Sequence, residues 1–128
     1  MDDDVGRLLV EHTEAWNSHD LERLMRLFAD DCVFEASAGP EPCGTRFVGR
    51  AQVRAAFQDV LAGMPDAHWG EARHAVIGED EGVSEWRLTG TFGDGTRLDV
   101  FGCDFLTLRH GQIVRKASFR KQRRPATA

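Results

Sequence analysis

Asp104 is the side chain whose position in the sequence points most clearly to chemistry. It lies in the segment 96–108, where the residues around it are apolar at both odd and even positions. A carboxyl group buried in such a strand costs free energy unless it is partnered or has a function. An acidic group in an apolar setting is suited to proton transfer. Asp104 is therefore a candidate catalytic acid or base.

The turns on either side of this segment predict which side chains lie beside Asp104. If Asp94-Gly95 forms a two-residue turn, Glu85 lies opposite Asp104. A three-residue turn at 109–111 would place Lys116 opposite Asp104 on the next strand, whereas a two-residue turn would send it to the other face. The favoured registers gather five polar side chains on one face of three strands: Glu85, Arg87, Asp104, Lys116 and Ser118.

Two interpretations of this polar face are open. It could line an internal cavity, with Glu85 and Asp104 as catalytic carboxylates and the basic and hydroxyl side chains binding a ligand. It could also face solvent, where cross-strand charge pairs contribute only ~0.2–1 kcal/mol each. In that case Trp86 and Leu88 would supply the face toward the core.

His12 is the polar residue to explain in the first half of the chain. It lies in an apolar helical stripe between Leu8 and Trp16. It is either a hydrogen-bonded core histidine or an acid–base group facing a ligand, since histidine titrates near neutral pH. The ring-bearing side chains that could line an apolar pocket, or simply form core, are Trp16, Phe34, Phe57, His68 and Trp69.

The elements that position these residues change period halfway along the chain. Apolar residues recur at helical spacing over 5–16, 21–28 and 53–61, which predicts three helices, with a short strand at 32–37 and a loop at 38–44. Four long strands are expected at 68–77, 83–92, 96–108 and 112–121. This order predicts an α+β fold, a cone-shaped α+β barrel in which a curved antiparallel sheet wraps around three N-terminal helices and leaves a cavity between them.

Composition limits the classes of protein to which the chain can belong. Its 128 residues, of 14.3 kDa, suit one domain, expected at 1–122, with a disordered tail at 123–128. The net charge of −5 argues against nucleic acid, and the basic residues after 114 are expected to be a solvated strand and tail. No apolar stretch reaches the ~18 residues of a membrane span.

The remaining expectations concern compartment, metals and cofactors. The acidic Met1-Asp2-Asp3-Asp4 is unlike a signal peptide, and three cysteines cannot all pair, so a cytoplasmic protein with reduced thiols is expected. The cysteines and histidines lack metal-ligand spacing, and no glycine motif for a dinucleotide or phosphate is present. Neither a metal nor a cofactor is expected.

Several short motifs resemble the nuclear transport factor 2-like superfamily, which includes ketosteroid isomerase and the SnoaL-like polyketide cyclases. They are Ala15-Trp16-Asn17-Ser18-His19-Asp20-Leu21, Leu27-Phe28-Ala29-Asp30-Asp31, Phe47-Val48-Gly49-Arg50, Val100-Phe101-Gly102-Cys103-Asp104 and Arg109-His110-Gly111-Gln112-Ile113-Val114. The resemblance covers roughly 5–121 and implies a conical α+β fold whose members are enzymes or binding proteins.

The resemblance also implies roles for individual positions. The isomerase base would fall near Ala36 and the isomerase tyrosine at His12, while a second cavity acid falls at Asp104, which is present. The cyclase aspartate would fall at Ser118. Both usual family bases are therefore absent, and the shared acid remains.

Two functions follow as expectations. The first is cofactor-independent proton transfer, as isomerisation, cyclisation or dehydration, on a small hydrophobic molecule, with Asp104, His12 and Glu85 as catalytic groups. The second is a non-catalytic domain of the same fold that binds a small molecule or dimerises. The resemblance further implies a homodimer formed through the sheet.

Overall fold

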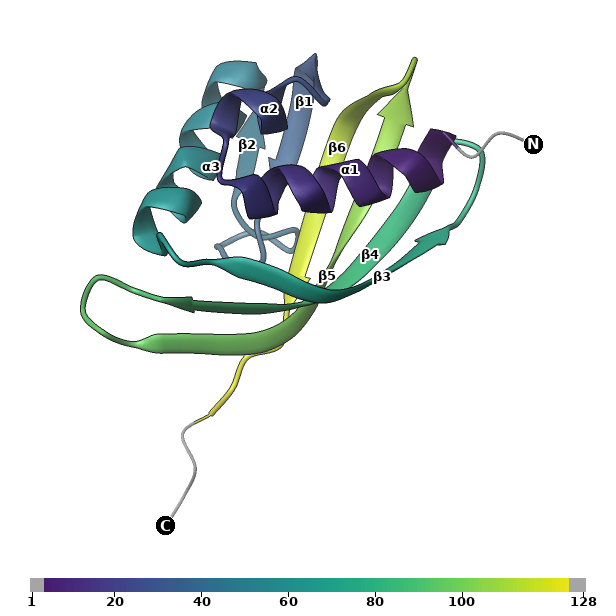
Figure 1. The fold of residues 1–128 in the computed structure, drawn as a ribbon. Coiled ribbons are helices and arrows are strands. Elements are labelled where there is room, and N and C mark those ends of the chain that lie inside the picture. Colours follow the sequence, from purple (N-terminus) through teal and green to yellow (C-terminus); the bar gives the residue numbers. More distant parts are fainter. Residues whose placement is uncertain (1–3, 125–128) are drawn as a thin grey trace.

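The computed structural model describes residues 4–124, so residues 125–128 of the expected tail lie outside the described part. Three helices, α1 (Asp4–Ser18), α2 (Leu21–Met25) and α3 (Arg50–Gly63), lie on one face of a curved sheet (Figure 1). The strands are β1 (Phe28–Glu35), β2 (Arg46–Val48), β3 (His68–Val76), β4 (Glu81–Thr91), β5 (Arg97–Arg109) and β6 (Gln112–Arg120). The expected α+β fold is confirmed.

The six strands form one sheet in the order β2-β1-β6-β5-β4-β3. All neighbours run antiparallel except β1 and β6, which are parallel. The sheet is curved but not closed over residues 4–124, since β2 and β3 are its two edges. Its concave face and the helices enclose the core, which is built on Leu9, Leu24, Phe28 and Phe57, all fully buried.

The first strand begins earlier than the sequence pattern predicts. Phe28, expected at the end of the second helix, starts β1 and pairs with Ile113 of β6. The helical spacing of Leu21, Leu24 and Phe28 is real, but a pairing partner more than 80 residues away decides the local structure. The short β2 lay in a segment with no strand expectation, and it pairs with β1 through Phe34 and Phe47.

The hairpin between β4 and β5 corrects the predicted register. Its loop has three residues, Gly93-Asp94-Gly95, because the Phe92 carbonyl accepts from Gly95 N–H at 2.9 Å and Phe92 N–H donates to the Thr96 carbonyl. Gly95 has φ +89°, the left-handed conformation that closes such a loop. The pairing therefore moves by one residue, and Asp104 lies opposite Ser84 rather than Glu85.

The hairpin between β5 and β6 reaches the expected face by a different route. Its turn has two residues, because Arg109 pairs with Gln112. A two-residue turn alone would place Lys116 on the opposite face of the sheet from Asp104. A bulge between Thr107 and Leu108 shifts the register by one residue and returns Lys116 to the same face. Lys116 consequently lies on the same face as Asp104, although the residue directly opposite Asp104 is Ser118.

The turn after α1 anchors the edge strand β3 beneath the helix. Asn17 exchanges two hydrogen bonds with the backbone of Trp69, at 2.9 and 2.8 Å, as a strand neighbour would. The His19 ring lies 2.6 Å from the Ala67 carbonyl, and the Asp20 carboxylate caps α2 by accepting from Arg23 N–H. These contacts hold Trp16 and Trp69 against each other, with ring centroids 4.9 Å apart.

Candidate functional site

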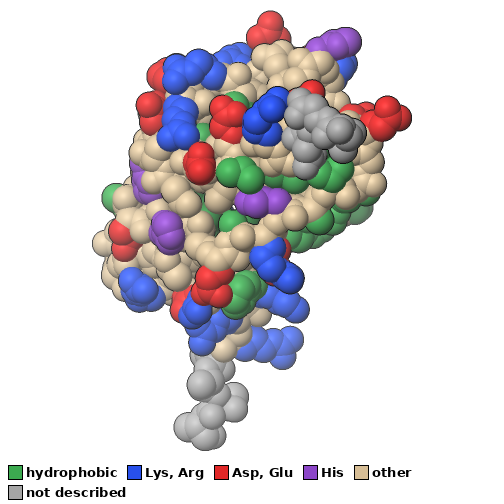
Figure 2. Space-filling model, turned by 45° about the vertical axis from the view of Figure 1, so that its right-hand side comes forward, with side chains coloured by type: hydrophobic (Ala, Val, Ile, Leu, Met, Phe, Trp, Pro, Cys, Tyr) green, Lys and Arg blue, Asp and Glu red, His purple; other side chains and the backbone are tan. Residues whose placement is uncertain are grey.

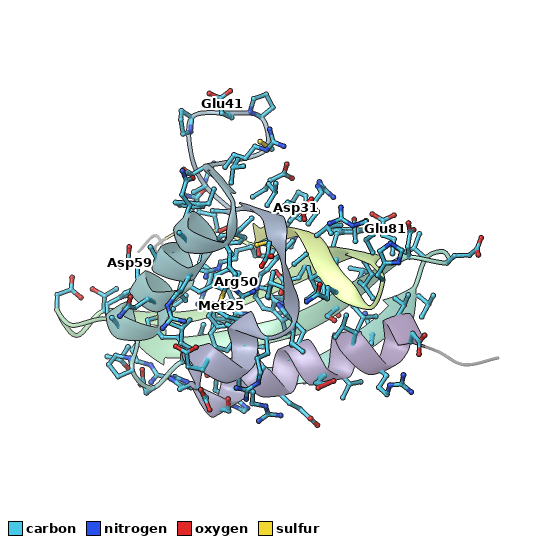
Figure 3. The ribbon with its side chains drawn as sticks, turned by 90° about the horizontal axis from the view of Figure 1, so that it is seen from above. Met25, Asp31, Glu41, Arg50, Asp59 and Glu81 are labelled. Atoms are coloured by element: carbon cyan, nitrogen blue, oxygen red, sulfur yellow. The ribbon has the colours of Figure 1, made fainter. Side chains whose placement is uncertain are left out.

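A pocket of about 270 Å³ lies between α1, α3 and the concave face of the sheet. Its walls are mainly apolar and come from Trp16, Phe34, Phe47, Val60 and Trp69. Asp59 of α3 also lines it, and Figure 3 shows that helix beside the protruding loop that carries Glu41. One end of the pocket is polar, with Asp104, Lys116, Ser118 and Arg120.

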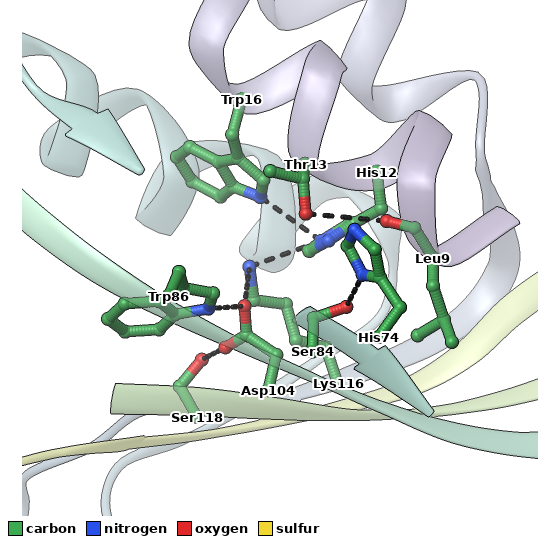
Figure 4. Close-up of polar contacts among 10 residues, drawn as sticks. All are labelled: Leu9, His12, Thr13, Trp16, His74, Ser84, Trp86, Asp104, Lys116 and Ser118. Atoms are coloured by element: carbon green, nitrogen blue, oxygen red, sulfur yellow. Dashed lines mark hydrogen bonds and ion pairs between the residues drawn. The ribbon is translucent and has the colours of Figure 1, made fainter. Parts of the chain in front are cut away.

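Asp104 is the centre of the polar end, and its side chain is partnered through both oxygens (Figure 4). The indole N–H of Trp86 donates to Oδ2 at 2.9 Å, and the Ser118 hydroxyl donates to Oδ1 at 2.5 Å. Lys116 Nζ lies 3.8 Å from Oδ2, and Asp104 as a whole is 3% exposed. Each carboxylate oxygen of Asp104 therefore accepts one hydrogen bond, and the Lys116 amine lies beside Oδ2.

Trp86 reaches Asp104 because the residue beneath its ring on the neighbouring strand is a glycine. Gly102 lies opposite Trp86 across β4 and β5, and a Cβ there would sit 2.5 Å from the indole. The missing side chain lets the ring lie against the strand with its N–H directed at the carboxylate. Gly102 is thus part of what positions the Asp104 hydrogen bond.

Lys116 is a buried amine surrounded by aromatic rings. Its Nζ lies 4.3, 5.1 and 5.6 Å from the ring centroids of Trp16, Phe57 and Phe34. Burial disfavours the ammonium form and lowers the pKa of Lys116 to about 8, although the charge of Asp104 acts in the opposite direction. The side chain is 5% exposed and lines the pocket.

His12 lies behind Lys116 and outside the pocket lining. Its Nε2 accepts from the Trp16 indole N–H at 3.1 Å, so this nitrogen carries no proton and Lys116 Nζ, 3.2 Å away, is also a donor to it. Burial, followed by the charge of Lys116, lowers the pKa of His12 well below its ordinary value. A neutral imidazole that orients the amine fits this geometry, in place of the expected proton donor facing the ligand.

A second histidine extends the polar cluster along the sheet. Ser84, which is fully buried opposite Asp104, lies with its hydroxyl 2.7 Å from Nδ1 of His74. Burial also lowers the pKa of His74. Ser84 was not a candidate from sequence because the predicted register turned it to the other face, and His74 was not singled out as a site residue either.

Glu85 and Arg87 lie on the convex face of the sheet, which corrects the predicted polar patch. Glu85 accepts from the Arg73 guanidinium at 2.7 Å, and Arg87 forms a two-pronged ion pair with Asp99 at 2.7 and 2.9 Å. The predicted register was wrong by one residue, so the prediction assigned every β4 side chain to the opposite face of the sheet. The solvent-facing interpretation therefore holds for β4, and the cavity interpretation holds for β5 and β6.

Two of the expected aromatic-pocket residues also lie elsewhere. His68 is exposed at the start of β3, and Phe57 is fully buried in the core beneath the pocket. The expected residues that do line the pocket are Trp16, Phe34, Trp69, Asp104, Lys116 and Ser118. The lining residues that sequence reasoning missed include Trp86 and Arg120, and recognition of Gly93-Asp94-Gly95 as a three-residue turn would have found Trp86.

The described residues contain no group of three or more histidine, cysteine or acidic side chains able to hold a metal ion. No helix within 4–124 is long and apolar enough to cross a membrane. What the site offers is a carboxylate, an amine and hydrogen-bond donors at the end of an apolar pocket. Such a set can polarise a carbonyl group and move a proton next to it.

Comparison with known families agrees with this architecture. Residues 9–116 match the SnoaL-like domain. The chain belongs to the SnoaL-like family. No curated protein matches the sequence.

Three solved structures illustrate how widely this SnoaL-like fold occurs. A "putative polyketide cyclase" from Xanthomonas campestris pv. campestris is 21% identical with TM-score 0.80, over 91% of this chain and 89% of its own. A protein of unknown function with a cystatin-like fold, from Xanthomonas campestris, is 16% identical with TM-score 0.81, over 94% of this chain and 92% of its own. A hypothetical protein with a ketosteroid isomerase-like fold, from Catenulispora acidiphila DSM 44928, was solved with trimethylamine and is 20% identical with TM-score 0.72, over 88% and 83%. These likenesses show the shared fold.

Proposed function

We propose that this SnoaL-like chain binds a small, largely apolar carbonyl compound and transfers a proton at the carbon next to the carbonyl. The observation that supports it is the pairing of Asp104 with Lys116 at the buried end of an otherwise apolar pocket. An apolar wall selects the body of such a molecule, and the polar end fixes its one oxygen. Isomerisation, cyclisation and dehydration all include this step.

Asp104 is the proton acceptor in this proposal. Each of its carboxylate oxygens accepts one hydrogen bond, which leaves further lone pairs for a substrate proton. As the C–H bond breaks, its electron pair moves toward the carbonyl oxygen, and the positive charge of Lys116 stabilises the product. Return of the proton to the same or another carbon completes the reaction without a cofactor.

A non-catalytic binding or dimerising domain is the second candidate. It is favoured by Ala36 and Ser118, which occupy the positions where the resemblance places the usual bases. In that case the pocket would hold the same kind of molecule without changing it. Binding without proton exchange distinguishes this candidate from the first.

The experiment uses 2-tetralone, a two-ring ketone with acidic protons beside its carbonyl. Their replacement in D₂O is followed by NMR, and binding is followed by thermal shift. The wild type should accelerate exchange, and Asp104→Asn should lower the rate at least ~10²-fold. Asp99→Asn, which removes a carboxylate from the convex face, should not. Equal rates with and without wild-type protein would refute proton transfer.

A further inference from the structure

Lysine is rare in this chain, and one of its two lysines is buried at the reactive end of the pocket. The sixteen basic residues include only Lys116 and Lys121 as lysines. Lys121 is exposed directly after β6, whereas the Lys116 side chain is 5% exposed. Arginine cannot lose its proton in proteins, but a desolvated lysine can, and it then becomes a nucleophile. Lys116 can therefore act as a nucleophile in the pocket, which none of the arginines can do.

The surroundings of Lys116 orient the amine and make its neutral form accessible near neutral pH. Three aromatic rings exclude water from Nζ, and the unprotonated Nε2 of His12 accepts its hydrogen bond at 3.2 Å. With a pKa of about 8, roughly a tenth of Lys116 carries a free lone pair at pH 7. That fraction is much larger than for a lysine with the ordinary pKa of 10.5.

We propose that Lys116 forms an imine with an aldehyde or ketone bound in the pocket. The inference rests on the carbonyl substrate class of the proposed function and gives Lys116 a covalent part in it. Asp104 lies 3.8 Å from Nζ, close enough to pair with the positively charged iminium as it pairs with the ammonium. An iminium withdraws electrons from the neighbouring C–H bond more strongly than a carbonyl does, which assists proton removal by Asp104.

The step balances without an additional reactant. The ammonium first gives a proton to the Asp104 carboxylate, whose Oδ2 lies 3.8 Å from Nζ, and the free lone pair forms the N–C bond while the C=O π pair moves to oxygen. Oxygen takes up that proton and a second one from nitrogen and leaves as water as the C=N bond forms. Ammonium and carbonyl thus become iminium and water with no change in total charge, so the charge balance with Asp104 is kept.

Reductive trapping tests the proposal on the intact wild-type protein. Benzaldehyde and sodium cyanoborohydride convert an imine into a stable benzylamine, which intact-mass spectrometry counts and peptide mapping locates. Lys116 should be labelled at least ~10-fold faster than Lys121, the internal control. The preference should disappear in 8 M urea, where both amines are in water. Labelling of Lys116 no faster than Lys121 in the folded protein would overturn the proposal.

Two variants separate a specific site from general amine reactivity. Lys121→Arg should leave the Lys116 adduct unchanged, and Lys116→Arg should remove it while retaining a positive charge. Exchange of 2-tetralone that needs Asp104 but gives no Lys116 adduct would refute the imine and leave the proposed proton transfer standing. An adduct at Lys116 without any exchange would support the imine and refute proton transfer.

Discussion

At the scale of single residues, the buried polar groups at the end of the pocket stabilise one another through hydrogen bonds and charge. Asp104 needs the Trp86 and Ser118 donors, Lys116 needs Asp104 and the aromatic rings, and His12 remains neutral beside the amine. Within residues 4–124, no buried side-chain nitrogen or oxygen lacks a hydrogen-bond partner. Complete pairing of this kind is what keeps a buried polar network from destabilising the fold.

The pKa of Lys116 makes a prediction about stability against pH. The folded-state pKa is about 8 and the ordinary value is 10.5, so between these values the unfolded chain binds more protons. Stability should therefore rise with pH across this window, and the total effect is about 3 kcal/mol. From pH 7.5 to 9.5 the wild type should gain about 2 kcal/mol relative to Lys116→Met, measured by urea denaturation.

The comparison between two proteins is needed because other groups titrate in the same range. Burial raises the pKa of the Cys32 and Cys103 thiols, which opposes the trend in both proteins alike. Lys121→Met serves as the matched control and should keep the wild-type slope. Parallel pH curves for wild type and Lys116→Met would contradict the description of Lys116 as a desolvated amine.

At the scale of elements, the sequence predicted the strands well and their register less well. Long alternating runs and glycine turns located β3 to β6 to within a few residues, because that information is local. The choice between a two- and a three-residue turn at Gly93-Asp94-Gly95 is a small difference in local free energy, yet it decides which face of β4 meets the core. The bulge before Leu108 and the start of β1 at Phe28 depend on partner strands, so no local pattern reveals them.

The same hairpin yields a prediction with an internal control. Gly95 has φ +89° and open space where a Cβ would be, so Gly95→Ala should destabilise by about 1 kcal/mol through backbone strain alone. Gly93 in the same loop also has open space but no positive φ, so Gly93→Ala should change stability by less than ~0.5 kcal/mol. Urea denaturation of both variants measures the difference. Equal effects would show that the loop does not depend on a left-handed Gly95.

At the scale of the whole molecule, the two faces of the sheet differ. The helices cover the concave face (Figure 1). The convex face exposes Phe101 and Phe119, which are 43% and 56% exposed. On the side shown in Figure 2, acidic and basic side chains are interspersed, with basic ones gathered toward the C-terminal end. Exposed aromatic side chains on a sheet are typical of a protein interface.

We expect the convex face to bind a second copy of the chain, as the family resemblance implies. Light scattering of the wild type at micromolar concentration should give twice the 14.3 kDa chain mass. Phe119→Glu should shift the population toward monomer, and Phe92→Glu, at the hairpin between β4 and β5, should not. A wild-type mass equal to a single chain would remove this expectation.

The most direct test of the central claim asks whether the chemistry takes place in the pocket. Ala56 of α3 lines the pocket, and its neighbour Ala55 is exposed on the same helix. Ala56→Trp, or the smaller intrusion Ala56→Leu, should fill the space and lower 2-tetralone exchange at least ~10-fold in protein that circular dichroism shows to be folded. Ala55→Trp should exchange at the wild-type rate. A folded Ala56→Trp variant with wild-type exchange would contradict the account.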